Sequence, residues 1–319
     1  MATVRIGISG WRYPPWRGVF YPKGLPQRNE LAYASSIFPS IEINGSFYSL
    51  QRPSSYGAWA KATPEHFQFS VKAPRFITHI RRLRGVDTAL ANFFASGVLR
   101  LDAKLGPILW QFPPSFRYDP KLMEAFFSSL PRTTGKAVEI ARRHDDHLRG
   151  RAWLAIDRSR RLRHAIEIRH HSFETSDFVG QLRRHRIGMV VADTAGRWPL
   201  IEDLTADFVY VRLHGDEVLY TSGYTPEALT GWAHKIDAWR RGTQAGGVRT
   251  FAPPGTVRKT GRDVFVYFDN DVKVRAPYDA MSLSHRLGLG PEPIDLPPPE
   301  SIREVARVQW PVYGRAAGM

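Results

Sequence analysis

Cysteine is absent from the chain, which excludes a disulfide framework and any thiolate chemistry. No run of about 18 apolar residues occurs, so the sequence predicts no membrane-spanning helix. The N-terminal residues MATVRIGISGW enter a strand pattern at once and lack the long apolar region of a signal peptide. These absences predict a cytoplasmic protein without a membrane partner.

Motifs that define common reaction classes are also missing. The sequence contains no GxSxG elbow, no P-loop and no GxGxxG fingerprint, so it does not support acyl-serine, nucleoside-triphosphate or dinucleotide chemistry. No HxH or HExxH pair places two metal ligands close together. We therefore expect no tightly bound metal, and the sequence does not indicate a cofactor.

Positive charge is what the chain has in excess. Its 319 residues carry a formal net charge of +15 and are 43% hydrophobic, which is typical of a globular protein with a sizeable core. Such a charge favours an anionic partner, such as a nucleic acid, a phosphorylated metabolite or an acidic membrane surface. The alternative is an arginine-rich composition without such a partner, because net charge does not say where the charges lie.

Eight short β-rich runs alternate with helical or loop segments. Over this length the alternation favours a closed barrel, so the predicted fold class is α/β, a somewhat irregular (β/α)8 TIM-type barrel. The clearest helix covers 225–242, where Thr225 is a good N-cap. The predicted strands are 5–10, 40–45, 67–74, 107–113, 165–171, 188–193, 208–215 and 264–270. Other helices are predicted at 27–38, 54–62, 87–101, 120–130, 173–186 and 275–288, and a short or irregular connection between 193 and 208.

Residues 1–287 are predicted to form a single barrel domain, followed by a proline-rich extension over 288–319. Two segments, at about 131–163 and 242–262, are interpreted as insertions. The first, here called the basic insertion, holds ten Lys or Arg residues against four acidic ones. The second is rich in Gly, Thr and Pro, which is typical of a loop.

Polar and apolar side chains alternate within several predicted strands. In the second strand, Ile41 and Ile43 share one face while Glu42 and Asn44 share the other. If the apolar set faces the outer helices, the polar set points into the barrel near its mouth, the C-terminal end of the strands where ligands bind in this fold. The alternative is a purely structural Glu–Arg network. Other strands add Lys72, Gln111, Glu167, Arg169, His170, Asp193, Arg212, His214 and Asp269.

The loop after the first strand is rich in aromatic residues, of which Trp11 and Tyr13 are candidate ligand contacts. At the mouth of a barrel such rings can stack on a base or a sugar. The alternative is a hydrophobic plug beneath the loop, in which the rings contact other side chains instead of a ligand.

Several motifs follow one another in a recognisable order: GISGWxYxxW (7–16), EINGSFY (42–48), Lys72, QFP (111–113), EIRHHSF (167–173), RLHG (212–215) and VYFDND (266–271). Their order and spacing resemble those of the YecE-like family, domain of unknown function 72. The resemblance extends over roughly residues 4–287 and implies a TIM-barrel fold, but no particular reaction. One departure is Asp269, which stands where Asn is common in the family and adds a carboxylate at the mouth.

The polar residues support an enzyme of hydrolase or sugar-phosphate type that acts on an anionic ligand. Arg169 and Arg212 suit a phosphate or carboxylate and would repel a metal cation. The candidate catalytic residues are Glu42, Glu167, His214 and Asp269, because ionisable groups with separated pKa values permit acid–base chemistry. The candidate ligand-binding residues are Trp11, Tyr13, Asn44, Lys72, Gln111, Arg169, His170, Asp193 and Arg212. No residue is assigned to a metal.

The alternative function is nucleic-acid binding through the basic surface, with the barrel as a scaffold. Such a protein would tolerate Glu42→Gln and Glu167→Gln, whereas an enzyme would not. Fold analogy does not choose between the two. Neither the substrate nor the oligomeric state is indicated by the sequence.

Overall fold

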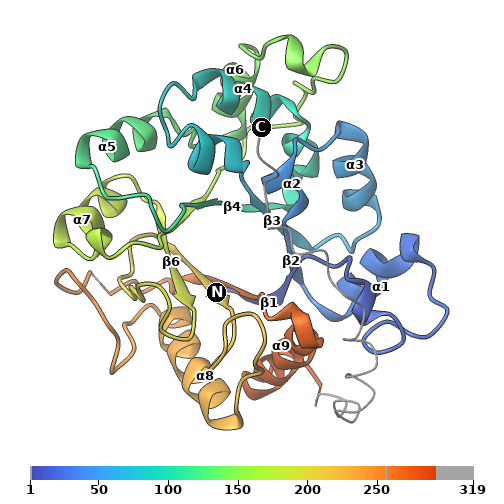
Figure 1. Cartoon of the computed structure of the whole chain (residues 1–319), viewed down its shortest axis with the longest axis vertical. Helices are drawn as coiled ribbons and strands as arrows, with labels where there is room; N and C mark the ends of the chain where they lie inside the picture. Colours follow the sequence, from blue (N-terminus) through green and yellow to red (C-terminus); the bar gives the residue numbers. More distant parts are fainter. Residues whose placement is uncertain (1, 256, 292–319) are drawn as a thin grey trace, which may run out of the picture.

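The computed structural model describes residues 2–255 and 257–291, which form a closed barrel of eight parallel strands surrounded by helices (Figure 1). Neighbouring strands pair in chain order, and β8 returns to pair with β1. The predicted TIM-type fold class is confirmed. The strands are β1 (Val4–Ser9), β2 (Ser40–Ile43), β3 (Gln68–Lys72), β4 (Leu105–Gln111), β5 (His164–Glu167), β6 (Gly188–Asp193), β7 (Phe208–Leu213) and β8 (Asp263–Phe268).

Helices occupy the outside of the barrel, and α5, α6, α7 and α8 begin at residues whose side chains cap them. Asp119 accepts hydrogen bonds from two backbone amides at the start of α5, and Thr225 accepts one at the start of α8. The α-helices are α1 (Glu30–Ile37), α2 (Gly45–Tyr48), α3 (Pro53–Lys61), α4 (Asp87–Ala95), α5 (Pro120–Ser129), α6 (Thr134–Ala141), α7 (Ser176–Arg184), α8 (Pro226–Arg240) and α9 (Arg275–Arg286). Short helical turns are η1 (Pro14–Trp16), η2 (Gln27–Asn29), η3 (Phe76–Ile80), η4 (Val98–Lys104), η5 (Asp146–Leu148), η6 (His171–Phe173) and η7 (Asp271–Lys273).

One helix differs from its predicted extent. The segment 87–101 is not continuous, because α4 ends at Ala95 and Gly97 then adopts a left-handed conformation with φ 107°. A Cβ atom at Gly97 would lie 2.5 Å from Pro53 Cα, so the close approach of α3 requires glycine there. The connection between β6 and β7 contains no helix among its described residues, as its short length predicted.

The two predicted insertions differ in structure. The basic insertion contains α6, whose buried Ala137 and Ala141 belong to the hydrophobic core. Residues 242–262 contain no helix or strand over the described positions. The proline-rich extension lies outside the described residues from position 292 onward. None of the described helices is long and apolar enough to cross a membrane.

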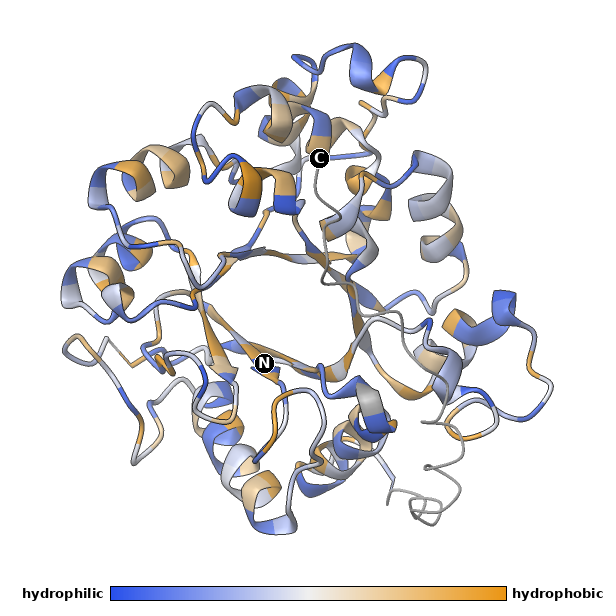
Figure 2. Ribbon diagram, in the orientation of Figure 1, coloured by the Kyte–Doolittle hydropathy of each residue, from blue (hydrophilic) through white to orange (hydrophobic). Residues whose placement is uncertain are grey.

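The core has two layers, because strand side chains alternate between the outer face and the lumen. Ile41 and Ile43 pack outward in the larger cluster, and apolar residues run along the strands in Figure 2. Tyr267 crosses the lumen and hydrogen-bonds to Ser40 at 2.6 Å and to Ser70 at 2.8 Å. The rest of the lumen is filled by Leu109, Ala165, Val190, Ala192, Phe208, Tyr210 and Phe265. This packing fills the lumen beneath the polar groups at its mouth.

Candidate functional site

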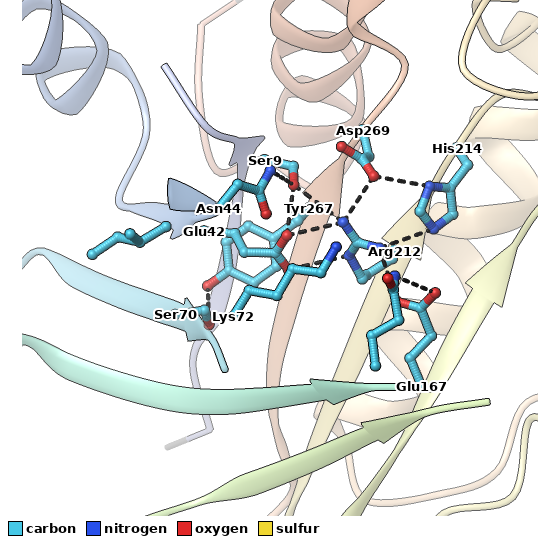
Figure 3. Close-up of polar contacts among 12 residues, drawn as sticks. Ser9, Glu42, Asn44, Ser70, Lys72, Glu167, Arg212, His214, Tyr267 and Asp269 are labelled. Carbon is cyan, nitrogen blue, oxygen red and sulfur yellow. Dashed lines mark hydrogen bonds and ion pairs between the residues drawn. The ribbon is translucent and has the colours of Figure 1, made fainter. Parts of the chain in front are cut away.

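The centre of the site is Arg212, which projects from β7 into the lumen and is fully buried. Its guanidinium donates to Glu42 at 2.9 Å, to Glu167 at 2.8 Å and to Asp269 at 2.8 Å (Figure 3). Burial disfavours the charge, but the three carboxylates raise the pKa of Arg212 well above its usual range. One permanently charged arginine therefore joins β2, β5 and the end of β8.

Glu42 has hydrogen bonds to both of its carboxylate oxygens. Oε1 accepts from Ser9 Oγ at 2.6 Å, and Oε2 accepts from the Tyr210 hydroxyl at 2.6 Å. Asn44 lies on the same face and donates to Ser9 Oγ at 2.9 Å. Asn44 Oδ1 is buried and accepts no hydrogen bond from any described residue. Because a buried acceptor without a partner costs about 1–3 kcal/mol, a ligand donor at this position would be stabilising.

Glu167 has the same kind of environment on the other side of the lumen. It accepts from Gln111 Nε2 at 2.8 Å and from Arg169 Nε at 2.9 Å, besides its contact with Arg212. Burial alone would raise the pKa of Glu167, but Arg212 and Arg169 lower it well below its usual range. The carboxylate therefore stays ionised and holds both guanidinium groups in place.

His214 contacts two members of this network through its two ring nitrogens. Nε2 lies 3.3 Å from Arg212 Nη1, and Nδ1 lies 3.1 Å from the Asp269 carboxylate. Burial, followed by the charge of Arg212, lowers the pKa of His214. Burial would raise the pKa of Asp269, but Arg212 and His214 lower it. The pair at neutral pH is thus a neutral imidazole beside an ionised carboxylate.

Basic side chains lie on the side of the site next to η3. Lys72, at the end of β3, is 9% exposed and extends toward Arg212 (Figure 3). His79 is surrounded by cations, since burial and then Lys72, Arg169 and Arg75 lower its pKa to about 4. Within the described ranges, neither Lys72 nor Arg75 has a carboxylate within ion-pair distance. The site therefore combines a buried acidic network with cations that have no acidic partner.

Asp271 is a member of the site that sequence reasoning missed. Burial and the neighbouring Asp269 raise its pKa well above the usual range, and a hydrogen bond from Tyr13 opposes that shift. Its Oδ1 accepts no hydrogen bond from the residues that the structure describes. The signal was the position of Asp271 two residues after Asp269 at a strand end. Tyr13, a predicted ligand contact, thus lies beside Asp271; its hydroxyl is also within hydrogen-bond distance of the Ser9 carbonyl, and its ring packs at a tilt against Trp16.

Three predicted ligand contacts lie apart from this cluster. Trp11 packs among aromatic rings of the outer core, because the apolar indole is stabilised there by burial. Nδ1 of His170 lies 3.0 Å from the Ser172 hydroxyl and accepts a hydrogen bond from the Ser172 backbone amide. Asp193 accepts a hydrogen bond from the Tyr224 hydroxyl at 3.1 Å.

Metal-ligating side chains do not gather anywhere in the described chain. No group of three or more His, Asp or Glu side chains there has an arrangement that could hold a metal ion. A hollow of about 780 Å³ opens beside the basic side of the site and shares Phe47 with it. Its walls include Tyr48, Phe76 and Ile80, all exposed. Space for an apolar part of a ligand thus adjoins Arg75 and Phe47, whose ring centre lies 4.3 Å from Lys72 Nζ.

Ion pairs occupy much of the basic insertion. The basic residues with acidic partners are Lys136, Arg149, Arg160, Arg161 and Arg163. Arg142, Arg143, Arg151 and Arg158 are exposed, and no acidic residue of the described chain lies within ion-pair distance of any of them. The free positive charge of the insertion is therefore smaller than its composition suggested.

Two known proteins are similar in sequence to part of this chain. The UPF0759 protein YunF of Bacillus subtilis is 37% identical over 118 residues, which are 35% of this chain and 41% of YunF. The UPF0759 protein YecE of Escherichia coli (strain K12) is 29% identical over 139 residues, or 43% of this chain and 48% of YecE. The chain thus aligns with less than half the length of either relative.

Two solved structures have the same fold. A DUF72 family protein of Thermotoga maritima has a TM-score of 0.66 and 23% identity, covering 90% of this chain and 99% of that one. A DUF72 family protein of Enterococcus faecalis has a TM-score of 0.63 and 17% identity, covering 92% and 100%. The family model described as "Protein of unknown function DUF72" matches residues 5–303. The resemblance indicated by the sequence motifs is confirmed, and the chain belongs to the DUF72 family.

Proposed function

We propose that the mouth of the barrel binds a small molecule carrying a phosphate or carboxylate group. The observation that carries this proposal is that two cations lie over adjacent rings at the mouth, Lys72 Nζ 4.3 Å from the centre of the Phe47 ring and Arg75 Cζ 6.0 Å from that of Tyr48. Lys72 and Arg75 have no acidic partner among the described residues, so an anionic ligand would match their charge. Arg169 Cζ lies 3.8 Å from the centre of the Trp198 ring, which together with the ion pair to Glu167 fixes the guanidinium at the mouth.

Acid–base catalysis of a hydrolytic reaction is the second part of the proposal. Arg212 and His214 lower the pKa of Asp269 while burial and Asp269 raise that of Asp271, and carboxyl groups whose pKa values are separated in this way can act as proton acceptor and proton donor. Glu42 and Glu167, whose oxygens already accept hydrogen bonds, would hold Arg212 in place. Asp271→Asn should then abolish turnover of a phosphate or carboxylate ester while leaving phosphate binding unchanged.

Calorimetric titration with inorganic phosphate and with acetate at constant ionic strength tests the binding proposal. We expect the wild type to bind at least one of them, and Arg75→Met to weaken binding by roughly 10- to 100-fold through loss of a charge-assisted hydrogen bond. Arg75 is exposed, so this variant should fold normally. Arg142→Met, which removes an equally exposed charge far along the chain, should bind as the wild type does.

Two results would contradict the proposal. One is a wild-type protein that binds neither anion; the other is equal affinity for the wild type and Arg75→Met. The competing hypothesis is a nucleic-acid surface on the basic insertion, where Arg142 and Arg143 are exposed without an acidic partner within the described chain. If that surface binds nucleic acid, Arg142→Met should weaken the binding of an oligonucleotide more than Arg75→Met does.

A further inference from the structure

Lys72 differs from the other lysines that the structure describes. Lys104 donates to backbone oxygens, at 2.6 Å for that of Ala60, and Lys235 forms an ion pair with Glu202 at 2.7 Å. Lys72 is buried, yet its ammonium has no hydrogen-bonded oxygen partner among the described residues. The ammonium nitrogen is not among the buried polar atoms of the described residues that lack a partner, so a buried stem carries an amine that still reaches solvent at the mouth.

The surroundings of Lys72 favour the uncharged amine. Its Nζ lies 4.3 Å from the centre of the Phe47 ring, and the permanent charge of Arg212 is nearby. Burial, and then Arg212, lower the pKa of Lys72 to about 8, so a fraction of the amine is unprotonated just above neutral pH. The groups that face it from the neighbouring elements are Glu42, Phe47, His79, Glu167, Arg212 and Asp269.

Position in the barrel gives this amine access to a ligand. Lys72 is the last residue of β3, at the mouth, beside the cations proposed to hold an anionic group. The hollow lined by Phe47 opens on the same side. A desolvated lysine next to a second cation is a recurrent way to make an amine nucleophilic toward carbonyl carbon.

We propose that Lys72 is a nucleophile that condenses with the carbonyl group of an anionic aldehyde or ketone bound at the mouth. The anionic part of this inference rests on the proposed function, whereas the reactivity of the amine does not. In the reaction the Nζ lone pair attacks the carbonyl carbon to form a carbinolamine, and the C–O bond then breaks. Overall, the lysine ammonium and the carbonyl compound give a protonated imine and one water, with no oxidant or reductant consumed.

Reductive trapping with cyanoborohydride tests the inference, since hydride converts the imine into a stable secondary amine. The full-length protein is treated at pH 7 with glyoxylate, an anionic aldehyde, or propionaldehyde, a neutral one, and modified lysines are located by peptide mass spectrometry. The chain has only nine lysines, so each can be followed separately. We expect Lys72 to be labelled at least tenfold faster than the exposed Lys136, and glyoxylate to label it faster than propionaldehyde does.

Two variants separate the amine from the charge. Lys72→Arg keeps the cation but cannot form an imine, so it should lose labelling at this position. Arg75→Met should lose the advantage of glyoxylate but keep the labelling of Lys72 by propionaldehyde. In the wild type, the rate at Lys72 should also rise between pH 7 and pH 9 and level off near the pKa of about 8.

The outcomes distinguish the inference from the proposed function. Labelling of Lys72 no faster than that of Lys136 by either aldehyde would overturn the inference, even if phosphate binds. Selective labelling by propionaldehyde without any preference for glyoxylate would support the nucleophile and overturn the anionic ligand. Labelling of residue 72 that fails to respond to pH would also overturn the inference, because a reactive amine must lose a proton first.

Discussion

Arg212 Nη1 lies 3.3 Å from His214 Nε2, and this contact decides which form of the imidazole is present. Because a guanidinium can only donate, Nε2 must be the acceptor. The ring proton of the neutral histidine is then on Nδ1, 3.1 Å from the Asp269 carboxylate. The protonation state of the site at the mouth is therefore set by the geometry of Arg212, not by His214 alone.

The first prediction is that His214 remains a neutral Nδ1–H imidazole across the physiological pH range. Its pKa is lowered by burial and by Arg212, so the unfolded chain takes up a proton first. The histidine therefore reduces the free energy of unfolding as pH falls below about 6.5. Nitrogen-15 NMR of the imidazole groups at a series of pH values measures this directly, with assignment by His214→Asn. A His214 titration midpoint at or above 6.5 would contradict it.

The second prediction concerns Arg212 itself. Arg212→Met should lower the free energy of unfolding by about 3–5 kcal/mol, because buried carboxylates lose their shared counter-charge. Urea denaturation measures the change. In a double-mutant cycle with Glu167→Gln, the two effects should be non-additive by about 0.5–3 kcal/mol, since the residues contact at 2.8 Å. The exposed Arg142→Met should change stability by less than about 0.5 kcal/mol, and an Arg212→Met midpoint equal to that control would refute the pairing.

Strand periodicity explains why much of the site could be predicted from the sequence. Alternation of Ile41 with Glu42, and of Val211 with Arg212, assigns each side chain to a face without knowledge of any long-range contact. Once eight strands close into a barrel, the polar face has only the lumen to occupy. The meeting of Arg212 with acids from distant strands follows from this geometry.

Residues in loops were harder to predict, for a physical reason. His79 lies in η3, Arg75 directly precedes η3, and Asp271 lies in η7. Side chains in these turns do not alternate between two faces as they do in a strand, so the sequence does not fix their direction. Trp11 illustrates the reverse problem. An aromatic residue in a mouth loop has the same appearance in the sequence whether it contacts a ligand or packs into the core, and only tertiary contacts separate the two.

The third prediction concerns the strand pair that brings Ser9 beside Glu42. Gly7 of β1 faces Ser40 of β2, and a Cβ atom added at Gly7 would lie 1.8 Å from the Ser40 carbonyl oxygen. Gly7→Ala must therefore push the strands apart, at a cost of more than about 4 kcal/mol in unfolding free energy.

Gly231 in α8 provides the matched control, because a Cβ atom there would meet nothing within 4 Å. Gly231→Ala should stabilise the protein by about 0.5–1 kcal/mol, as alanine is the better helix former. Thermal unfolding of both variants measures the contrast. If Gly7→Ala proved as stable as the wild type, the close approach of β1 and β2 would be wrong.

The last prediction sets the small-ligand proposal against nucleic-acid binding. Protein–DNA affinity falls with salt by a log–log slope of roughly −0.9 for each phosphate contacted. Five basic residues of the basic insertion are already paired with acids, which leaves Arg142, Arg143, Arg151 and Arg158 exposed without such partners in the described chain. Any duplex binding through the insertion should therefore have a slope no steeper than roughly −4, to which Arg142 and Arg143 would contribute about half.

Titration of a labelled duplex between about 50 and 200 mM salt measures this slope, over the range in which non-specific electrostatic binding weakens most. Arg142→Ala with Arg143→Ala is the appropriate variant, because deletion of the whole insertion would also remove the buried Ala137 and Ala141 of α6 from the core. A slope of roughly −3 to −4, made shallower by about 2 on that double substitution, would establish the insertion as a nucleic-acid surface. A shallow slope that the substitution leaves unchanged is expected if the anionic ligand is a small molecule at the mouth, since Lys72 and Arg75 belong to a different part of the chain.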